Sequence, residues 1–253
     1  MPLSDEQALL SAMIAGADRI VALTGAGLST ECGIPDFRSP DSPWMRVKPI
    51  DFQAFMASEQ SRREAWRRKF VIDDLMAQAQ PGRGHRALAR LVASGKMIAV
   101  ITQNIDGLHQ RSGIAESRII ELHGNGTYAA CLDCGRRHEL APIRRAFAAS
   151  GTLPRCACGG IVKAATISFG QKLPADAMLK AQQVACACDL FIAIGSSLVV
   201  HPAAGLPVLA KRHGAKLLIV NAQETPLDAL SDALLHGDIG TLFEHIDAPR
   251  RAS

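Results

Sequence analysis

Six short apolar runs recur along this 253-residue chain, and they constrain its fold more than any other feature. They lie at residues 19–24, 97–101, 118–122, 165–169, 190–194 and 216–220. The runs are nearly continuous rather than alternating, which is typical of strands buried on both faces of a parallel sheet. Helical stretches such as HRALARLVAS and ADAMLKAQQVACA lie between them. The alternation predicts an α/β fold with a doubly wound parallel sheet.

Two segments interrupt this alternation. Residues 40–84 are rich in charge and helical in period, and residues 128–163 are rich in Cys, Gly and Arg. Each is too short to build a core alone without a disulfide or a structural metal, so we interpret both as insertions. The remaining residues, 1–39, 85–127 and 164–253, then form one large domain. The first insertion has five basic residues among the eight from Arg62 to Lys69, which fits either a solvated helix face or a site for an acidic partner.

Composition narrows the class of protein. The formal charge of +4 comes from 28 basic and 24 acidic residues, which is too even to indicate nucleic-acid or membrane binding. No stretch reaches the roughly 18 uninterrupted apolar residues of a membrane helix, and the first residues, MPLSDEQALL, lack the layout of a signal peptide. We therefore expect a cytoplasmic protein that binds neither membranes nor specific nucleic-acid sequences. A monomer is assumed, since the sequence does not indicate the oligomeric state.

The stretch GAGLSTECGIPDFR, residues 25–38, follows the first predicted strand. Gly25 and Gly27 can adopt positive φ and let backbone N–H groups approach a pyrophosphate. The usual dinucleotide fingerprint G-x-G-x-x-G fails, because Thr30 stands where the third glycine belongs. A tight structural turn is therefore the alternative to a nucleotide site.

The end of this stretch carries an acid, an aromatic ring and a guanidinium, in Asp36, Phe37 and Arg38. They follow a proline in a segment of turn composition, which favours an ordered surface loop. Such a set suits a charged ligand that contains a ring. The simpler alternative is a surface pair between Asp36 and Arg38, worth less than about 1 kcal/mol.

Two more polar segments follow predicted strands. TQNIDGLH, residues 102–109, brings Gln103, Asn104, Asp106 and His109 to the carboxyl edge of the sheet, where amides can bind a carboxamide ring and ribose hydroxyls. Turn chemistry alone would explain Asn104 and Asp106. His123 ends the strand at 118–122, and histidine is the side chain whose pKa suits proton transfer near neutrality. A lone histidine is usually structural, but its position at the same edge favours catalysis.

Four cysteines form two close pairs, CLDC and CAC, at Cys131, Cys134, Cys156 and Cys158. Four thiolates at such spacing predict a closed tetrahedral zinc site, and closed sites are structural. The second pair is C-x-C where C-x-x-C is usual, so its geometry is tighter. Zinc binding contributes on the order of 10 kcal/mol to folding, which would stabilise an insertion with little apolar core.

Taken in order along nearly the whole chain, these blocks resemble the sirtuins, which are NAD-dependent protein lysine deacylases. The blocks are GAGLSTECGIPDFR, TQNIDGLH, LHG, the two cysteine pairs, GSSLVVHPA (195–203) and IVNAQ (219–223). The resemblance implies that residues 1–39, 85–127 and 164–253 form a Rossmann-like NAD-binding domain. Residues 40–84 and 128–163 would form a small helical and zinc-binding domain. NAD, consumed as a co-substrate, and an acyl-lysine protein or peptide would meet in the cleft between the two.

The resemblance also implies roles for individual residues. The residues that would bind NAD are Gly25, Ala26, Gly27, Ser29, Asp36, Phe37, Arg38, Gln103, Asn104, Ile105, Asp106, Gly195, Ser196, Ser197, Asn221 and Ile239. The peptide would pair as an added strand with Ile167, Ser168, Phe169 and Gly170. The catalytic residues would be Asn104 and His123, the latter as general base on a ribose hydroxyl while the acyl oxygen attacks the anomeric carbon and nicotinamide leaves.

Two departures from the family pattern bear on specificity. Gln171 stands after the FG pair, where the family often has an acidic residue, and this leaves the peptide preference open. Glu64 and Ala65 precede Arg67 and Arg68, so the tyrosine that marks desuccinylating members is missing. The chain resembles most closely the mitochondrial and bacterial class with weak deacetylase activity. Removal of longer acyl chains, or ADP-ribosyl transfer to protein, therefore remains an alternative.

Two rival interpretations come from other classes. A hydride-transferring dehydrogenase needs the full glycine fingerprint, against which Thr30 argues. A zinc-ribbon nucleic-acid module would need a basic surface with aromatic residues. The nearly even charge and the single aromatic residue beside the cysteines, Tyr128, argue against that module.

Overall fold

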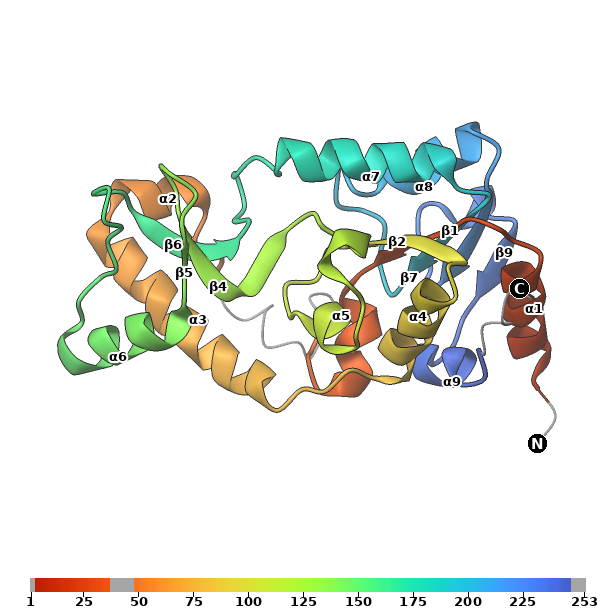
Figure 1. Ribbon diagram of the computed structural model, residues 1–253, viewed down its shortest axis with the longest axis horizontal. Coiled ribbons are helices and arrows are strands. Elements are labelled where there is room, and N and C mark those ends of the chain that lie inside the picture. Colours follow the sequence, from red (N-terminus) through yellow and green to blue (C-terminus); the bar gives the residue numbers. More distant parts are fainter. Residues whose placement is uncertain (1–2, 37–47, 247–253) are drawn as a thin grey trace.

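The centre of the protein is a six-stranded parallel sheet, seen in a computed structural model that describes residues 3–36 and 48–246 (Figure 1). Its order is β3-β2-β1-β7-β8-β9, and every neighbouring pair is parallel. The strands are β1 Ile20–Thr24, β2 Met97–Thr102, β3 Ile119–Glu121, β7 Leu190–Ile194, β8 Lys216–Val220 and β9 Ala233–Leu235. This is the doubly wound Rossmann order, so the predicted fold class is confirmed.

Helices cover both faces of the sheet (Figure 1). One face packs against α1 Asp5–Ala15, α4 Arg83–Ala93 and α9 Ile239–Phe243. The other face packs against α7 Ala175–Ala187 and α8 Gly205–Arg212. All five residues of β1 and all five of β7 are buried, which explains why these strands appear in the sequence as uninterrupted apolar runs.

Short helices complete the large domain. They are η1 Ala26–Cys32, α5 Leu108–Arg111, η3 Glu116–Arg118 and η4 Asp228–Leu230. At the start of the chain, the Ser4 hydroxyl accepts a hydrogen bond from the Gln7 backbone, and the Gln7 side chain accepts one from the Ser4 backbone. This capping box fixes the first turn of α1. In the described part of the chain, no helix is both long and apolar enough to cross a membrane.

A smaller domain lies at the other end of the molecule (Figure 1). It contains the antiparallel sheet β5-β4-β6 and three helices. These elements are β4 Gly124–Cys131, β5 Arg137–His138, β6 Val162–Thr166, α2 Phe52–Ala57, α3 Glu59–Ala77 and α6 Leu140–Ser150. Trp66 and Phe70 of α3 pack with Ile143 of α6 and with Val162 of β6, so segments far apart in sequence share one core.

Polar contacts also connect the two segments of the small domain. Arg144 of α6 forms a two-pronged ion pair with Asp74 of α3, with both N···O distances at 2.7 Å. The same guanidinium lies 5.5 Å from the ring centre of Phe70. Helix α3 is thereby held against α6 by apolar and charged contacts together.

One predicted strand was assigned to the wrong sheet. Residues 165–169 were expected in the parallel sheet, but the strand here is β6, Val162–Thr166, which pairs antiparallel with β4. The pairing begins where Gly124 lies opposite Thr166, and residues beyond Thr166 leave the strand. Strand β9 was missed in the sequence because its three apolar residues are flanked on both sides by polar residues and so form no run of strand length.

Candidate functional site

The polar segments identified in the sequence meet at one edge of the sheet. All six strands of the large sheet are parallel, so their carboxyl ends lie together. The strand order reverses between β1 and β7, because β1 continues to β2 on one side and β7 to β8 on the other. Ligands of open α/β sheets bind at such a switch point.

The glycine loop is held directly against the loop that follows β7. The Gly25 N–H donates to the Ile194 carbonyl, and the Gly27 N–H donates to the Gly195 carbonyl, each at 2.9 Å. A Cβ on Gly25 would lie 2.6 Å from the Gly195 oxygen, and a Cβ on Gly27 would lie 2.8 Å from the Gly195 Cα. Neither Gly25 nor Gly27 has positive φ, so that expectation was wrong. Both positions need glycine because two backbones approach closely.

A hydrogen-bonded group joins the glycine loop to the loop after β2. The Ser29 hydroxyl, which is buried, donates to the Asp106 carboxylate at 2.8 Å. The Asn104 amide donates to the Gly25 carbonyl at 3.0 Å and to the Ser29 hydroxyl at 3.2 Å. Asp106 also accepts from the Leu108 N–H at 2.8 Å, which starts α5. The two loops are therefore fixed relative to each other before any ligand binds.

His123 lies in the short connection between β3 of the large sheet and β4 of the small one. Its Nδ1 is 3.0 Å from the Gln103 carbonyl oxygen. A carbonyl only accepts, so Nδ1 carries the hydrogen and Nε2 of the neutral ring keeps its lone pair. Burial lowers the pKa of His123, while the Gln103 carbonyl acts in the opposite direction. The ring is consequently neutral and basic at Nε2 near pH 7.

Gly124 lets the chain turn sharply from His123 into the small sheet. Its φ is +73°, and a Cβ there would lie 2.0 Å from the Ala165 carbonyl oxygen. The His123 carbonyl in turn accepts from the Ile167 N–H at 2.8 Å. The segment 167–170, predicted to bind the substrate, is thus tied to His123 through the backbone. Phe169 is 69% exposed, and its carbonyl accepts from the Phe52 N–H of the helical insertion at 2.9 Å.

The remaining predicted site residues lie along the same edge. The Gln103 side chain donates to the Ser196 hydroxyl at 2.8 Å. The Ile105 carbonyl accepts from the Gly126 N–H at 2.7 Å. Ala26 and Ser197 are half-buried, and Asn221 is buried with its amide donating to the Gln223 carbonyl at 2.8 Å.

Five predicted residues remain. Ile239 begins α9 and is buried in the apolar core. Asp36 is half-buried. Phe37 and Arg38 lie outside the described residues. His109 was expected at the sheet edge, but it is buried beneath the site, with its Nε2 2.9 Å from the Thr24 hydroxyl.

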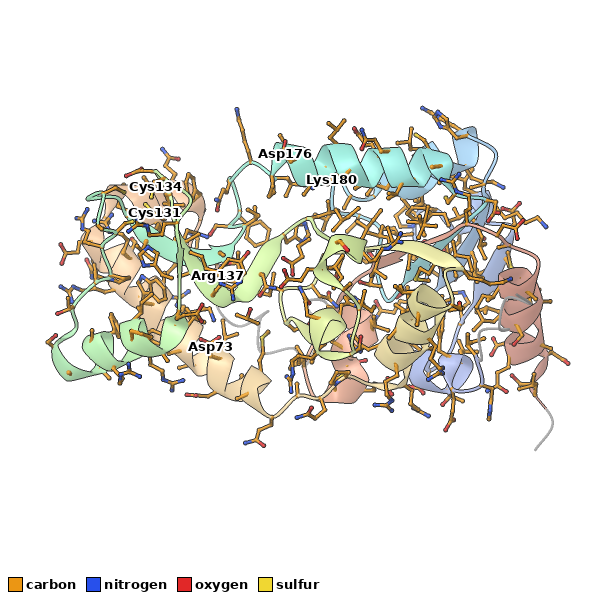
Figure 2. The ribbon with its side chains drawn as sticks, in the orientation of Figure 1. Asp73, Cys131, Cys134, Arg137, Asp176 and Lys180 are labelled. Carbon is orange, nitrogen blue, oxygen red and sulfur yellow. The ribbon has the colours of Figure 1, made fainter. Side chains whose placement is uncertain are left out.

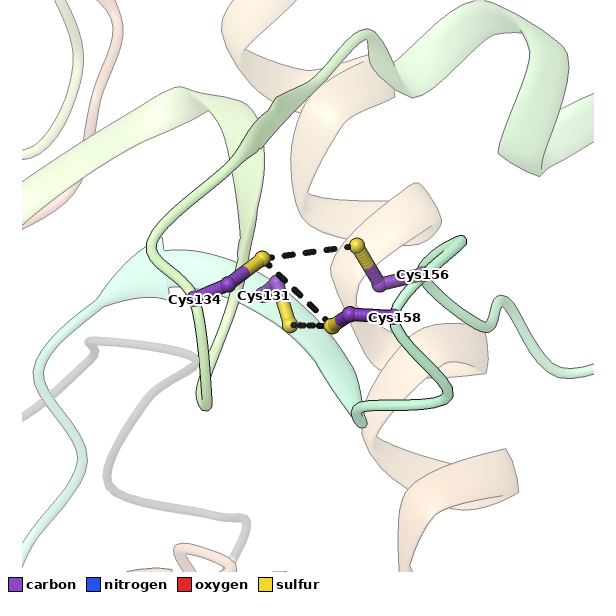
Figure 3. Close-up of side chains that lie close together, drawn as sticks. All are labelled: Cys131, Cys134, Cys156 and Cys158. Atoms are coloured by element: carbon purple, nitrogen blue, oxygen red, sulfur yellow. Dashed lines mark hydrogen bonds between the residues drawn. The ribbon is translucent and has the colours of Figure 1, made fainter.

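The four predicted zinc ligands come together in the small domain, where Figure 2 labels Cys131 and Cys134 and Figure 3 shows all four. Their sulfur atoms lie within 4.8 Å of one another, and the contacts drawn in Figure 3 are 3.5–3.6 Å. Four thiolates at a Zn–S distance of about 2.3 Å in a tetrahedron lie roughly 3.8 Å apart, so the cluster fits zinc. Backbone N–H groups of Cys134 and Asp133 lower the pKa of Cys131 to about 7. For Cys158, the Gly160 N–H lowers the pKa, but the neighbouring cysteine side chains outweigh it and raise the pKa to about 12. The fit to zinc therefore rests on the positions of the four sulfur atoms. The tight C-x-C pair does not prevent convergence.

Comparisons with known proteins agree with this geometry. Residues 25–202 match the Sir2 family. The chain is 57% identical over 91% of its length to an NAD-dependent protein deacetylase of Rhodopseudomonas palustris, of which it covers 92%. It is 56% identical to NAD-dependent protein deacetylase 1 of Bradyrhizobium diazoefficiens, with 91% of each chain covered. A solved structure of Sir2 with a p53 peptide and NAD+ matches with a TM-score of 0.84 and 36% identity, over 96% of this chain and 97% of that one.

Proposed function

The chain belongs to the Sir2 family and is an NAD-dependent protein deacetylase, and from this premise we propose which residues carry out its reaction. The overall reaction takes NAD, an acyl-lysine and water to nicotinamide, free lysine and acyl-ADP-ribose. The observation that supports the assignment best is the convergence of the glycine loop, Asn104 and His123 at the β1/β7 switch point.

NAD would lie along the carboxyl edge of the large sheet. The turn from Gly25 through Ala26 and Gly27 would face its pyrophosphate together with Arg38, and Phe37 would cover the nicotinamide. The N–H groups of Gly25 and Gly27 already donate to backbone carbonyls, so their role is to permit the close turn. Further along the edge, the residues that would hold the adenosine half are Gly195, Ser196, Ser197, Asn221 and Ile239.

The nicotinamide ribose would be held by Ser29, Gln103, Asn104, Ile105 and Asp106. The carboxylate of Asp106 fixes Ser29, and Ser29 accepts from Asn104. This prior ordering lowers the entropy lost when the ribose binds. Asn104 would orient the reacting end of the sugar, which makes it the second catalytic residue.

His123 would act as the general base. Its Nε2 takes a proton from a ribose hydroxyl while the acyl oxygen bonds to the anomeric carbon and the nicotinamide bond breaks. The Gln103 carbonyl holds the hydrogen on Nδ1, so the ring presents the correct nitrogen. We assign the substrate to a strand paired with Ile167, Ser168, Phe169 and Gly170, a mode that reads little peptide sequence.

The small domain would close the other side of the substrate cleft. We keep the division into residues 1–39, 85–127 and 164–253 for NAD, and 40–84 with 128–163 for the helical and zinc-binding insertions. Structural zinc held by the four cysteines would stabilise that domain and take no part in the chemistry. None of the seven cysteines, all within the described residues, forms a disulfide, which fits a reducing compartment, and we propose the cytoplasm.

The acyl preference would be for uncharged groups. Arg67 and Arg68 both pair with Glu64, at 2.7 Å and 2.6 Å, so neither guanidinium is available alone for an acidic acyl group. We propose that acetyl and longer neutral chains are removed, and that the chain falls in the class with weak deacetylase activity.

The test is a comparison of acyl groups on one peptide. The pure protein is mixed with NAD and acetyl-, propionyl-, myristoyl- or succinyl-lysine versions, and both nicotinamide and deacylated peptide are measured. We expect equal amounts of both products, none with succinyl-lysine, and a loss of at least about 100-fold for His123→Ala. Nicotinamide release without deacylated peptide would instead indicate ADP-ribosyl transfer or NAD hydrolysis.

A further inference from the structure

Four polar side chains lie buried directly beneath the candidate site and have no role in the reaction above. They are Thr24 at the end of β1, Thr102 at the end of β2, His85 in α4 and His109 in α5, and each is at most 3% exposed. We refer to them as the buried polar cluster. Polar groups at this depth are costly unless they are hydrogen-bonded, so their arrangement needs an explanation.

The hydrogen bonds of the cluster have a defined direction. The Asn104 N–H donates to the Thr102 hydroxyl oxygen at 3.0 Å, and the Thr24 hydroxyl donates to the same oxygen at 2.9 Å. Because Thr24 has used its only hydrogen, its oxygen can only accept from His109, whose Nε2 is 2.9 Å away. With the hydroxyl hydrogen bond in this direction, His109 carries its hydrogen on Nε2.

His85 is constrained in the same way from the other side. The Gly82 N–H points at its Nδ1 at 3.3 Å, so the neutral ring has its hydrogen on Nε2. The His85 and His109 rings are 5.1 Å apart between centres. His85 Nε2 and His109 Nδ1 are buried and have no hydrogen-bond partner within residues 3–36 and 48–246. In these tautomers His85 Nε2 is a donor and His109 Nδ1 is an acceptor, so the two neutral rings can lie next to each other without two like groups facing.

The surrounding charges do not overcome burial. Asp106 and Glu31 favour a proton on His85, Arg86 opposes it, and the Cys32 sulfur lies 3.8 Å from its Nδ1. Burial nevertheless lowers the pKa of His85. For His109, burial and the neighbouring His85 lower the pKa to about 3. Both rings therefore stay neutral at physiological pH, as the direction of the hydrogen bonds through Thr24 and Thr102 requires.

We propose that His109 is a positioning residue for Asn104, acting through the hydroxyl groups of Thr24 and Thr102. The Nε2–H of His109 donates to the Thr24 oxygen, so the Thr24 hydroxyl donates to Thr102. The Thr102 oxygen, held in place by that bond, accepts the Asn104 N–H. The side chain of Asn104 is then aimed at the Gly25 carbonyl and the Ser29 hydroxyl. The inference rests on the proposed role of Asn104 in the deacetylase reaction.

Isosteric variants separate positioning from packing. Thr24→Val keeps the shape and removes the hydroxyl, whereas Thr24→Ser keeps the hydroxyl and removes a methyl group. His109→Leu removes the donor, whereas the amide nitrogen of His109→Gln can replace Nε2. We expect Thr24→Val and His109→Leu to lower kcat about 10- to 100-fold with acetyl-peptide and NAD, because small misplacements of catalytic groups cost that much. Thr24→Ser and His109→Gln should stay within about threefold of wild type.

Activity is measured well below the melting temperature of every variant, so a purely structural role would lower Tm and leave kcat unchanged. A wild-type kcat for folded Thr24→Val would overturn the proposal. Nitrogen NMR of the wild-type histidine rings gives a readout that needs neither a variant nor activity. We expect Nε2–H on His109, and Nδ1–H there would also overturn it. A wild-type protein that releases no nicotinamide would instead refute the proposed function and leave the ring assignment testable.

Discussion

The Gln103 carbonyl oxygen lies 3.0 Å from Nδ1 of His123. The residue that orients the proposed base therefore follows β2, whereas the base itself follows β3, the adjacent strand of the parallel sheet. The contact sets the tautomer of the base through the backbone, so substitution of the Gln103 side chain leaves that acceptor in place. This arrangement leads to a defined dependence of the reaction on pH.

We expect kcat/KM to fall on the acid side with an apparent pKa below 6.5. Burial lowers the pKa of His123 from that ordinary value, and the opposing effect of the Gln103 carbonyl is smaller. The base is consequently active at pH 7 and is lost only when the ring is protonated at lower pH. The measurement is nicotinamide release between pH 5 and 8.5, with binding of NAD followed over the same range. An acid limb centred above pH 7 would contradict this environment for His123.

Gly195→Ala should disrupt the contact between the glycine loop and the β7 loop. Its φ is +61°, and an added Cβ would lie 2.4 Å from the Leu28 backbone nitrogen. We expect NAD affinity to fall at least about tenfold, with a loss of stability of roughly 2 kcal/mol or more. Gly214→Ala is the matched control, because its φ is +91° but nothing lies within 4 Å of the added atom. Calorimetric NAD titrations and thermal melts of both variants check this, and equal effects would exclude steric contact as the cause.

Removal of one zinc ligand should unfold the small domain. Cys156 is buried among the apolar residues of that domain and lies 3.6 Å, sulfur to sulfur, from Cys134. We expect Cys156→Ser to lose the metal and much of a stabilisation on the order of 10 kcal/mol. Elemental analysis should give one zinc per wild-type chain and none in the variant. Cys186→Ser, at a half-buried thiol outside the cluster, should keep its zinc. If Cys156→Ser retained both zinc and the wild-type melting curve, the assignment of Cys156 to a structural zinc site would be wrong.

Acid should destabilise the protein through His109. Its pKa is lowered to about 3 in the folded state from an ordinary 6.5, so the unfolded state binds the extra proton between these values. Stability is therefore fully present above pH 6.5 and is lost as pH falls toward 3, by at most about 1.4 kcal/mol per pH unit for this residue. The free energy of unfolding, measured with urea at pH 7.5, 6 and 5, should fall less steeply with decreasing pH for His109→Gln than for wild type. His213→Gln, at an exposed site, should retain the wild-type slope.

Gln171→Glu should shift the peptide preference while leaving the loop intact. The Gln171 side-chain oxygen accepts from the Ser168 N–H at 3.1 Å, and a glutamate oxygen can accept the same bond. The new negative charge beside the proposed substrate strand should lower KM a few-fold for peptides with Lys or Arg near the acyl-lysine, since partly exposed pairs contribute less than about 1 kcal/mol. A peptide with Ser at those positions is the control. Unchanged KM for both peptides would place the substrate elsewhere.

The large sheet was predictable because its central strands β1, β2, β7 and β8 are buried almost throughout, whereas β3 is only partly buried but still lies in an apolar run. Strands β1, β2, β3, β7 and β8 each coincide with an apolar run. Strand β6 was assigned to the wrong sheet, because it carries a buried Lys163 and its pairing with β4 joins residues 31 to 42 positions apart. The Lys163 amine donates to the Thr166 carbonyl and faces the Phe55 ring, and burial lowers the pKa of Lys163 to about 8. Such a lysine is read from sequence as a surface residue.

The site could be predicted as a set of loops, but its internal contacts could not. Each segment follows a strand, and that order is visible in the sequence. The reason for glycine at Gly25 and Gly27 is the neighbouring Gly195, which lies about 170 positions away and becomes adjacent only through the pairing of β1 with β7. For His109, the sequence shows a polar residue after a strand, but not that α5 turns it inward toward Thr24.

The pairing of β1 with β7 also sets the order in which the protein can mature during its synthesis. One edge of β1 is covered as soon as β2 emerges, but the other waits for Leu190–Ile194. At about 5–20 residues per second, translation of the chain from the end of β2 to the start of β7 takes roughly 4 to 18 s. Throughout that interval a nascent chain has an apolar strand with one open edge, a known template for misassociation. The proposed NAD site is incomplete throughout that interval, because Gly195, one of its proposed residues, has not yet been synthesised.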